Sequence, residues 1–573
     1  MQISLVSVSF AETKDDDDDA REDSEITTEE ESKHGAAVAS AHPYATRAGI
    51  QILEQGGNAF DAAIAVTAAL AVVEPAGSGL GGGGFWLLHD SGTGENIMVD
   101  GREKAPLAAT RDMYLDQNKN VIPKLSVDGA LAAGIPGEPA ALAWIAENHG
   151  VLPLSQSLAP AIRLAEKGFP VGPKYYRLMK FRANAIKASP AAAEIFLVNG
   201  EVPSIGYTIV QRDLANTLKQ IAEKGHDGFY KGEVAQKLVD GVRASGGIWT
   251  MEDLEQYGVR IREPITVNYK GMKVTSAGLP SSGGLVLAQS LNILSGYDLE
   301  AMNELDFTHL TVEAMRRAYR DRAQYMGDED FVDVPTEMIA DVDYAHGLRQ
   351  SIRMDSAMPS KRLAPTQSHD PQGQDTTHFS VLDKMGNRVA ATLSINYPFG
   401  SGVVASGTGV LLNDEMDDFS SKPGVPNVYG LIGAEANAIE PGKRMLSSMS
   451  PTFLETRGRV AIVGTPGGSR IISMVLLAAL EFHKGAGAKS VVSRPRFHHQ
   501  YLPDSIQYEP GALSEATLAG LIERGHELKP RDRTWGNMHV VTLNKHTATV
   551  GAASDSRGEG KAQIIPKWRR FGV

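Results

Sequence analysis

The sequence predicts an α+β fold with a helical region followed by a strand-rich one. Between residues 43 and 325, apolar side chains recur with helical spacing in segments of about eight to twenty residues. After residue 376, short segments alternate between apolar and polar side chains, which is typical of half-buried strands. The chain has 573 residues, of which 42% are hydrophobic, so it can bury a large core. This length allows one or two large domains or up to about four small ones.

The charge and the cysteine content exclude several classes of function. The chain has 69 acidic and 56 basic residues, a net charge of −13, and no cysteine. A protein that neutralises nucleic-acid phosphates concentrates lysine and arginine, so the excess of acids argues against general nucleic-acid binding. Without cysteine there can be no disulfide bond, no thiolate nucleophile and no cysteine-ligated metal site.

Most of the negative charge lies near the N-terminus. Residues 12–33 contain twelve acidic and three basic side chains, a net charge of −9, which leaves −4 for the rest of the chain. Like charges repel one another and bury no apolar surface, so we expect a disordered acidic arm here. We therefore place residues 1–35 outside the fold.

A short apolar stretch precedes the acidic arm. Residues 3–10 are mostly apolar and are followed by Ala11, which resembles the end of an export signal without the usual basic start. We therefore expect a periplasmic or secreted protein. The longest apolar run, 62–73, is too short to span a bilayer and is bounded by Asp61 and Glu74. It is predicted to be a buried core helix.

The helices of the first region follow from periodicity and from their end signals. A helix over 43–55 stops at the Gly56-Gly57 pair, and Asn58 can cap a second helix over 59–73. Further helices are predicted at 137–148, 154–167, 212–224, 233–244, 284–294 and 306–325. Short strands at 265–269 and 272–275 lie between them.

A polar segment separates the helices from the later strands. Residues 360–375 (SKRLAPTQSHDPQGQD) lack apolar periodicity, so they should form an exposed, cleavable loop. Residues 376–383 and 388–396 then read as two strands joined by the turn residues KMGN. If this hairpin closes around Met385-Gly386, residues 394–396 lie beside Thr376. Further strands are predicted at 409–412, 452–455, 459–463, 539–543 and 547–550, with helices at 470–484 and 514–524.

The common motifs for nucleophiles and metals are absent from the sequence. There is no G-x-S-x-G, H-E-x-x-H or Walker A pattern, and the adjacent His498 and His499 cannot share one face as metal ligands do. What remains is Thr376, at the start of a strand directly after a cleavable loop. A threonine hydroxyl needs a base, and the α-amino group of the same residue can serve as one. That amine, with a reference pKa of about 7.7–8.0, exists only if the Asp375–Thr376 bond is cut.

Several longer motifs carry the most specific signal. They are GGNAFDAA, GSGLGGGGF, DGREKAP, DTTHFSVLDKMGN, LLNDEMDDFSSKPGVPNVYG, KRMLSSMSPT, GTPGGSRII and PRFHHQYLPD. From about residue 36 to its end, the chain resembles the γ-glutamyltranspeptidase (glutathione hydrolase) family of N-terminal nucleophile hydrolases. The resemblance implies a four-layer αββα sandwich, made as one precursor that cuts itself before Thr376. The large subunit would be 36–375 and the small subunit 376–573, together forming one catalytic unit.

The resemblance also implies roles around the scissile bond of the substrate. Thr376 would be the nucleophile and would form a γ-glutamyl ester. Ser394, at a position that is typically threonine in the family, would support it with a hydroxyl. The backbone N–H groups of Gly467 and Gly468 would form the oxyanion hole. Residues 420–442, which include Tyr429, resemble a lid loop over the donor pocket and favour small substrates over polymers.

A γ-glutamyl donor also presents an α-carboxylate and an α-ammonium, which need opposite partners. A guanidinium suits the planar carboxylate, and carboxylate or amide oxygens suit the ammonium. The residues implied for the carboxylate are Arg102, Ser447 and Ser448. The residues implied for the ammonium are Asn396, Glu415 and Asp418; glutamine replaces Glu415 in some members.

The leading hypothesis is a self-processing γ-glutamyltransferase and glutathione hydrolase. It would pass the γ-glutamyl group of glutathione to an amino acid, a dipeptide or water, as a heterodimer of two chains from one precursor, with no metal or organic cofactor. One alternative is a cephalosporin-type acylase of the same architecture. Another is an unprocessed, inactive homologue that acts as a binding protein.

Overall fold

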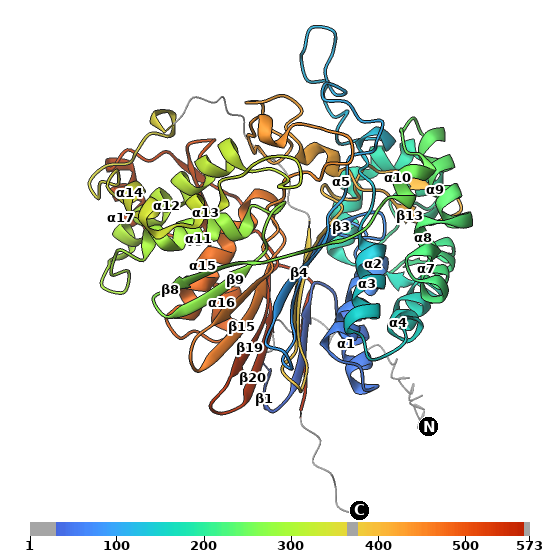
Figure 1. Cartoon of the computed structure of the whole chain (residues 1–573), viewed down its shortest axis with the longest axis horizontal. Coiled ribbons are helices and arrows are strands. Elements are labelled where there is room, and N and C mark those ends of the chain that lie inside the picture. The colour runs from blue at the N-terminus through green and yellow to red at the C-terminus, as the bar shows by residue number, and fades with distance from the viewer. Residues whose placement is uncertain (1–29, 364–375, 567–573) are drawn as a thin grey trace, which may run out of the picture.

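Two seven-stranded antiparallel sheets face each other, and helices cover the outer face of each sheet (Figure 1). The computed structural model describes residues 30–363 and 376–566. In Figure 1 the helices α1–α4 and α7–α10 lie on the right and the helices α11–α17 on the left, with both sheets between them. The predicted four-layer αββα sandwich is therefore confirmed.

Both sheets combine strands from distant parts of the chain. The first sheet has the order β1 (Glu30–Lys33), β20 (Thr549–Ser554), β19 (His539–Asn544), β15 (Arg459–Gly464), β14 (Thr452–Glu455), β9 (Met272–Ser276) and β8 (Ile265–Tyr269). The second has the order β21 (Lys561–Ile565), β2 (Ala36–Ser40), β10 (Thr377–Leu382), β11 (Arg388–Ser394), β3 (Gly83–His89), β4 (Asn96–Gly101) and β7 (Arg260–Arg262). Each sheet contains strands that precede residue 376 and strands that follow it.

The helices divide between the two outer layers in chain order. Those on the side of the second sheet are α1 (Pro43–Glu54), α2 (Ala59–Val73), α3 (Glu138–His149), α4 (Leu154–Lys167), α5 (Pro173–Ala188), α6 (Pro190–Phe196), α7 (Arg212–Lys224), α8 (Asp227–Tyr230), α9 (Gly232–Ala244) and α10 (Met251–Glu255). Those on the side of the first sheet are α11 (Gly283–Leu294), α12 (Glu304–Tyr325), α13 (Thr336–Ala340), α14 (Val342–Arg349), α15 (Ile471–His483), α16 (Ala488–Ser493) and α17 (Glu515–Glu523). No helix within the described ranges is both long and apolar enough to cross a membrane.

Three apolar cores lie between the four layers, because successive side chains of a strand point to opposite faces. On β2, Val38 packs against the helices while Ala37 and Ala39 face the other sheet. On β15, Ile462 faces the inter-sheet core and its neighbours Ala461 and Val463 face the helices. Strands buried on both faces read as continuous apolar runs, which explains why alternation is weak in their sequences.

Helix α2 shows why the apolar run at 62–73 is not a membrane segment. All fifteen of its residues are buried, because it packs between the second sheet and the helices α1 and α4. Asn58 caps it as expected: its side chain accepts from the backbone N–H groups of Phe60 and Asp61, and Asp61 accepts in return from Asn58.

The predicted hairpin around residue 385 is also confirmed. β10 pairs with β11 so that Thr377 faces Leu393, which brings Thr376 next to Ser394. β10 is held on its other side by β2, and β11 by β3, so both hairpin strands lie inside the second sheet. Thr376 therefore directly precedes the first residue of a central strand.

Several expectations need correction or lie outside the described residues. Glu30–Lys33 form β1, so the fold begins before the boundary expected at residue 35; the acidic arm and export signal otherwise fall in 1–29, outside the described residues. In the loop expected at 360–375, Ser360 is buried in a short 3₁₀ helix, Ser360–Arg362, because Asp504 and Arg316 bind it. Residues 364–375 lie outside the described residues.

The inter-sheet core predicts the effect of a cavity. Leu87 on β3 is fully buried between the sheets, whereas Met385 in the hairpin turn is 78% exposed. Leu87→Ala should lower the free energy of unfolding by about 2–5 kcal/mol, and Met385→Ala should change it by less than about 0.5 kcal/mol. Urea denaturation of both variants measures the difference. Equal effects would contradict this assignment of the core.

Candidate active site

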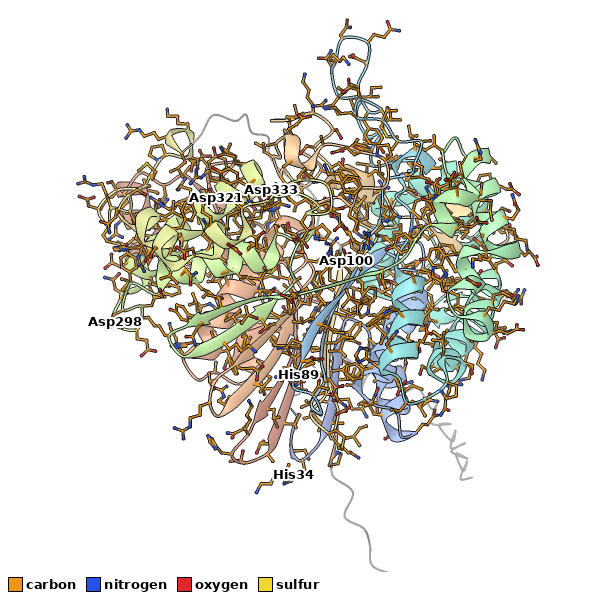
Figure 2. The ribbon with its side chains drawn as sticks, viewed as in Figure 1. His34, His89, Asp100, Asp298, Asp321 and Asp333 are labelled. Atoms are coloured by element: carbon orange, nitrogen blue, oxygen red, sulfur yellow. The ribbon has the colours of Figure 1, made fainter. Side chains whose placement is uncertain are left out.

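Most of the predicted site residues line one pocket. They come from separate stretches of chain, and the pocket-lining residues among them are Arg102, Thr376, Ser394, Asn396, Glu415, Asp418, Tyr429, Ser447, Ser448 and Gly468. Gly467 directly precedes Gly468, and Asp375 lies outside the described residues. A larger hollow near Asp298, at the left edge of Figure 2, contains none of these side chains.

Thr376 lies at the buried end of this pocket, with 5% of its surface exposed. Ser394, opposite it in the hairpin, accepts a hydrogen bond at its Oγ from the backbone N–H of Asn396 at 2.8 Å. Asn396 has a left-handed backbone with φ of 72°, and its amide donates to the backbone oxygen of Asp414. Asparagine tolerates this conformation better than most residues, so the turn after β11 directs its side chain with little strain.

A turn at the end of β4 positions Arg102. The backbone N–H of Arg102 donates to Asp100 Oδ1 at 2.9 Å, and Arg262 Nε donates to the other oxygen of Asp100 at 2.8 Å. Arg444 also reaches Asp100, at 3.4 Å. Asp100 lies near the middle of the molecule in Figure 2, between the two helical halves. The motif DGREKAP therefore supplies both the guanidinium and the carboxylate that anchors its backbone.

The guanidinium of Arg102 is buried and bound by several carboxylates. It donates to Glu415 Oε2 at 2.5 Å and to Asp418 Oδ2 at 2.6 Å, and Glu103 Oε2 lies 3.4 Å from Nη1. Arg102, Glu103 and Glu415 are each about 1% exposed or less, and Asp418 is 14% exposed. Three acids thus surround one arginine, and charges this poorly solvated interact strongly.

This crowding changes the protonation of the acids. The pKa of Glu415 is raised to about 7. Burial raises it most, Arg102 opposes this effect, and the nearby Asp418 adds to it. Burial also raises the pKa of Glu103 well above its usual range, with an added contribution from Glu415. The site therefore favours an additional positive charge, because an ammonium would stabilise the ionised carboxylates.

The glycines after β15 have conformations and surroundings that exclude other residues. Gly467 has φ of 147° and Gly468 has φ of 55°, both in the region that favours glycine. A Cβ on Gly468 would lie 2.6 Å from Cδ1 of Tyr429, so the aromatic ring packs directly on the glycine backbone. Tyr319 fixes the same turn from α12 by donating to the backbone oxygen of Ser469 at 2.5 Å.

Tyr429 lines the pocket, and hydrogen bonds hold this residue and the two that precede it. Its hydroxyl donates to the backbone oxygen of Asn396 at 2.6 Å. The preceding Asn427 donates to Asp418 at 3.1 Å, and Val428 donates its N–H to Asp417 at 2.9 Å. Residues 427–429 are therefore tied to the same acidic turn that binds Arg102.

The two serines of KRMLSSMSPT contact the side chains of residues that the sequence analysis did not predict to be part of the site. Ser448 Oγ accepts a hydrogen bond at 3.2 Å from Arg322, a buried residue near the end of α12. Arg322 also donates to Ser282 Oγ at 2.9 Å, and Ser282 donates to the backbone oxygen of Ser447. A second guanidinium thus lies beside the pocket. Its spacing does not distinguish it from the other arginines of α12, so only the tertiary contact reveals it.

Comparison with known proteins settles the family. The sequence matches the Gamma-glutamyltranspeptidase family over residues 45–565. The chain belongs to this family. The glutathione hydrolase proenzyme of Pseudomonas sp. (strain A14) is a γ-glutamyltranspeptidase relative with 46% identity over 492 residues, 85% of each chain. That of Escherichia coli (strain K12) is 42% identical over 525 residues, 91% of this chain and 90% of its own.

The family fold is confirmed by a solved structure as well. A cephalosporin acylase from Bacillus halodurans superposes with a TM-score of 0.83 and 27% identity, over 99% of this chain and 100% of that chain. The fold described above is therefore shared over 99% of this chain with an enzyme that is named for another substrate.

The contact between Gly468 and Tyr429 predicts a measurable strain. Gly468→Ala combines a left-handed backbone with a collision against the ring, whereas the exposed Gly511, with φ of 71°, has no atom within 4 Å of an added Cβ. Gly511→Ala should cost only the backbone penalty of about 1–2 kcal/mol in unfolding free energy. Gly468→Ala should cost more, by about 1–3 kcal/mol. Equal losses in urea denaturation would show that the ring does not pack on this glycine.

Proposed function

We propose that this chain is a self-processing γ-glutamyltransferase and glutathione hydrolase with Thr376 as its nucleophile. The observation that carries the proposal is the position of Thr376, at the start of a central strand and in the same pocket as Arg102 and its carboxylate partners. The glutathione hydrolase proenzymes that share 42–46% of their residues with this chain support it.

In this mechanism the Thr376 hydroxyl attacks the γ-carbonyl carbon of the donor, and its proton passes to the α-amino group of Thr376. The amine then returns the proton to the leaving amine, cysteinylglycine when the donor is glutathione. The γ-glutamyl ester on Thr376 is finally cleaved by water or by the amine of an acceptor, which restores the hydroxyl. The backbone N–H groups of Gly467 and Gly468 would stabilise the oxyanion; one such donor typically contributes about 10²–10³ in rate.

The nearest histidine is unsuited to act as the base, which favours the α-amine. His378 lies between the sheets, and its ring bonds to Thr392 at 2.8 Å and Ser380 at 3.2 Å. Burial lowers the pKa of His378 well below its usual range, and His539 adds to this effect. His378 therefore stays neutral with both ring nitrogens engaged.

The donor's α-amino acid head would bind by exchanging partners with the existing ion pairs. Its carboxylate would take Arg102 together with Ser447 and Ser448, and its ammonium would take Glu415, Asp418 and Asn396. The protein groups of both new pairs are already poorly exposed to solvent, so the further desolvation falls mainly on the donor's own charges. Arg322, which donates to Ser448, would hold that hydroxyl in place for the carboxylate.

The charges around the pocket favour a γ-glutamyl donor over the donor of an acylase. A cephalosporin side-chain donor without an α-amino group gives the buried Glu415, Glu103 and Asp418 no cation beyond Arg102. The same set suits an ammonium. The higher identity to glutathione hydrolases, compared with 27% to the Bacillus halodurans acylase, points the same way.

Self-cleavage between Asp375 and Thr376 would divide the sandwich into two chains. The large subunit would be 36–375 and the small subunit 376–573, and the acidic arm and export signal would precede them. Because each sheet interleaves strands from both parts, neither part would keep its sheets without the other. We infer a stable heterodimer that is exported through the segment 3–10.

Processing and turnover should depend together on Thr376. In denaturing electrophoresis the protein should run as two bands, and Thr376→Ala should give one full-length band. The wild type should release product from γ-glutamyl-p-nitroanilide, faster when glycylglycine is added, and Thr376→Ala should not. A processed protein that lacks this turnover would favour the acylase; a single band in the active wild type would overturn self-cleavage.

The raised pKa of Glu415 predicts a specific pH dependence. Below pH 7 the free carboxyl holds a proton that donor binding must displace, because the ammonium prefers the ionised form. The amine of Thr376 must also lose a proton, so log(kcat/KM) should fall with a slope approaching about two on acidification.

Glu415→Gln removes the first of these protons and keeps an acceptor oxygen. Its slope should approach about one, and kcat/KM at pH 8.5 should stay within about tenfold of the wild type. The slope of log kcat should be about one in both proteins. Identical kcat/KM slopes in both would show that Glu415 is not the carboxyl that titrates.

A further inference from the structure

Behind the pocket, a buried ion pair contacts the residue that follows the nucleophile. The hydroxyl of Thr377 donates to Glu74 Oε2 at 2.6 Å, and the other oxygen of Glu74 accepts from Lys174 Nζ. Thr377 is fully buried, Glu74 is 6% exposed and Lys174 is 19% exposed. Nothing in the proposed chemistry of the donor head uses these groups.

The three residues belong to different elements and to both parts of the chain. Glu74 ends the buried helix α2, Lys174 lies in the first turn of α5, and Thr377 opens β10. Cleavage before Thr376 would leave Glu74 and Lys174 in the large subunit and Thr377 in the small subunit. The hydrogen bond would then cross the subunit boundary one residue from the new N-terminus.

The carboxylate also lies near the backbone of the nucleophile. A Cβ built on Gly77 would be 3.5 Å from both Glu74 Oε2 and the carbonyl oxygen of Thr376. Both groups therefore flank one glycine, and the α-amine of Thr376 lies within roughly 10 Å of the Glu74 charge, a range over which buried charges still interact.

Glu74 occupies a position that is energetically unfavourable for a carboxylate. A carboxylate at a helix C-terminus is disfavoured by the helix dipole, and a buried carboxylate needs a cation. Lys174 supplies that cation from another helix. A pair assembled this way beside the nucleophile has two physical effects: it fixes Thr377, and the cation offsets the charge of the Glu74 carboxylate near the amine.

We propose that Glu74 is a positioning residue, which holds Thr377 and whose charge, offset by Lys174, has only a limited electrostatic effect on the α-amine of Thr376. This inference rests on the proposed role of that amine as the base.

Other charged groups surround the two sites and must be considered. Those near Glu74 and Lys174 are Glu559, His42 and His539; those on the pocket side of Thr376 are Arg102, Glu415, Asp418 and Arg322. Burial and the charge of Lys174 lower the pKa of both His42 and His539 to about 3, so neither histidine titrates near neutral pH. Burial is the larger of the two causes, so both histidines should stay neutral near neutral pH when Lys174 is replaced.

Single substitutions of Glu74 and Lys174 should shift the pKa of the α-amine in opposite directions. Glu74→Gln keeps an acceptor for Thr377 and removes one negative charge near the amine, which disfavours the protonated amine. The acidic limb of the kcat profile should shift down by about half to one pH unit. Lys174→Met leaves the carboxylate uncompensated, so the limb should shift up by a similar amount. The double variant should return to the wild-type limb.

The positioning effect is tested separately at Thr377. Thr377→Val removes the hydroxyl and should lower kcat by about tenfold or more, because small displacements of a nucleophile are costly. KM for γ-glutamyl-p-nitroanilide should stay within about twofold, since the donor-binding residues are untouched. Thr377→Ser should restore kcat. A merely structural role would lower thermal stability without this split between kcat and KM.

Matched controls come from an exposed pair on the outer helices. Glu166 on α4 and Lys219 on α7 form an ion pair at 2.5 Å, with side chains 43% and 48% exposed. Glu166→Gln and Lys219→Met make the same charge changes and should leave the kcat profile unmoved. Shifts in one common direction, or none, for the Glu74 and Lys174 variants would overturn the electrostatic role, and an unchanged kcat in Thr377→Val would overturn the positioning role. Absence of turnover in the wild type would instead reject the proposed function.

Discussion

The pairing of β10 with a strand on each side is the constraint on which the site depends. β2 and β11 both bind its backbone, so Thr376 directly precedes a strand whose position is fixed by main-chain hydrogen bonds in a buried sheet. β11 returns beside it and delivers Ser394 and Asn396 to the same end of the sheet. In the proposed function, a nucleophile held this way would need no ordered loop to orient it, and the site would keep its geometry after a cut directly before it.

The second determinant is the charge balance around Arg102. Four buried or half-buried groups, three acids and one guanidinium, meet where two turns and a sheet end converge, and their desolvation makes each one sensitive to the others. A donor that carries both charges can satisfy the whole set, whereas a donor that carries one charge or none cannot. Specificity for an α-amino acid head would thus arise from the surplus of acid as much as from the arginine.

Sequence patterns predicted the local elements well and the global arrangement only through family resemblance. The limits of α2 and the hairpin register follow from capping and alternation, which act over a few residues. Strands β2 and β21 were not predicted: each is short, and each pairs with strands hundreds of residues away. Arg322 and Glu74 could not be predicted from the sequence either, because their partners Ser448 and Thr377 come from the other part of the chain. The excess of acidic groups around Arg102 could also not be predicted from the sequence. The motif shows that Glu103 follows Arg102, but only the structure shows that Glu103 is buried beside the guanidinium.

The measurement that tests the central claim most directly is the location of the acyl group. The enzyme would be mixed with a γ-glutamyl donor, quenched in acid within one turnover and digested for peptide mass spectrometry. The account predicts one γ-glutamyl group, in ester linkage, on the N-terminal threonine of the fragment that begins at Thr376. A γ-glutamyl group on another side chain, such as Ser447 or Ser448, or on a Thr376 that is still joined to Asp375, would contradict it.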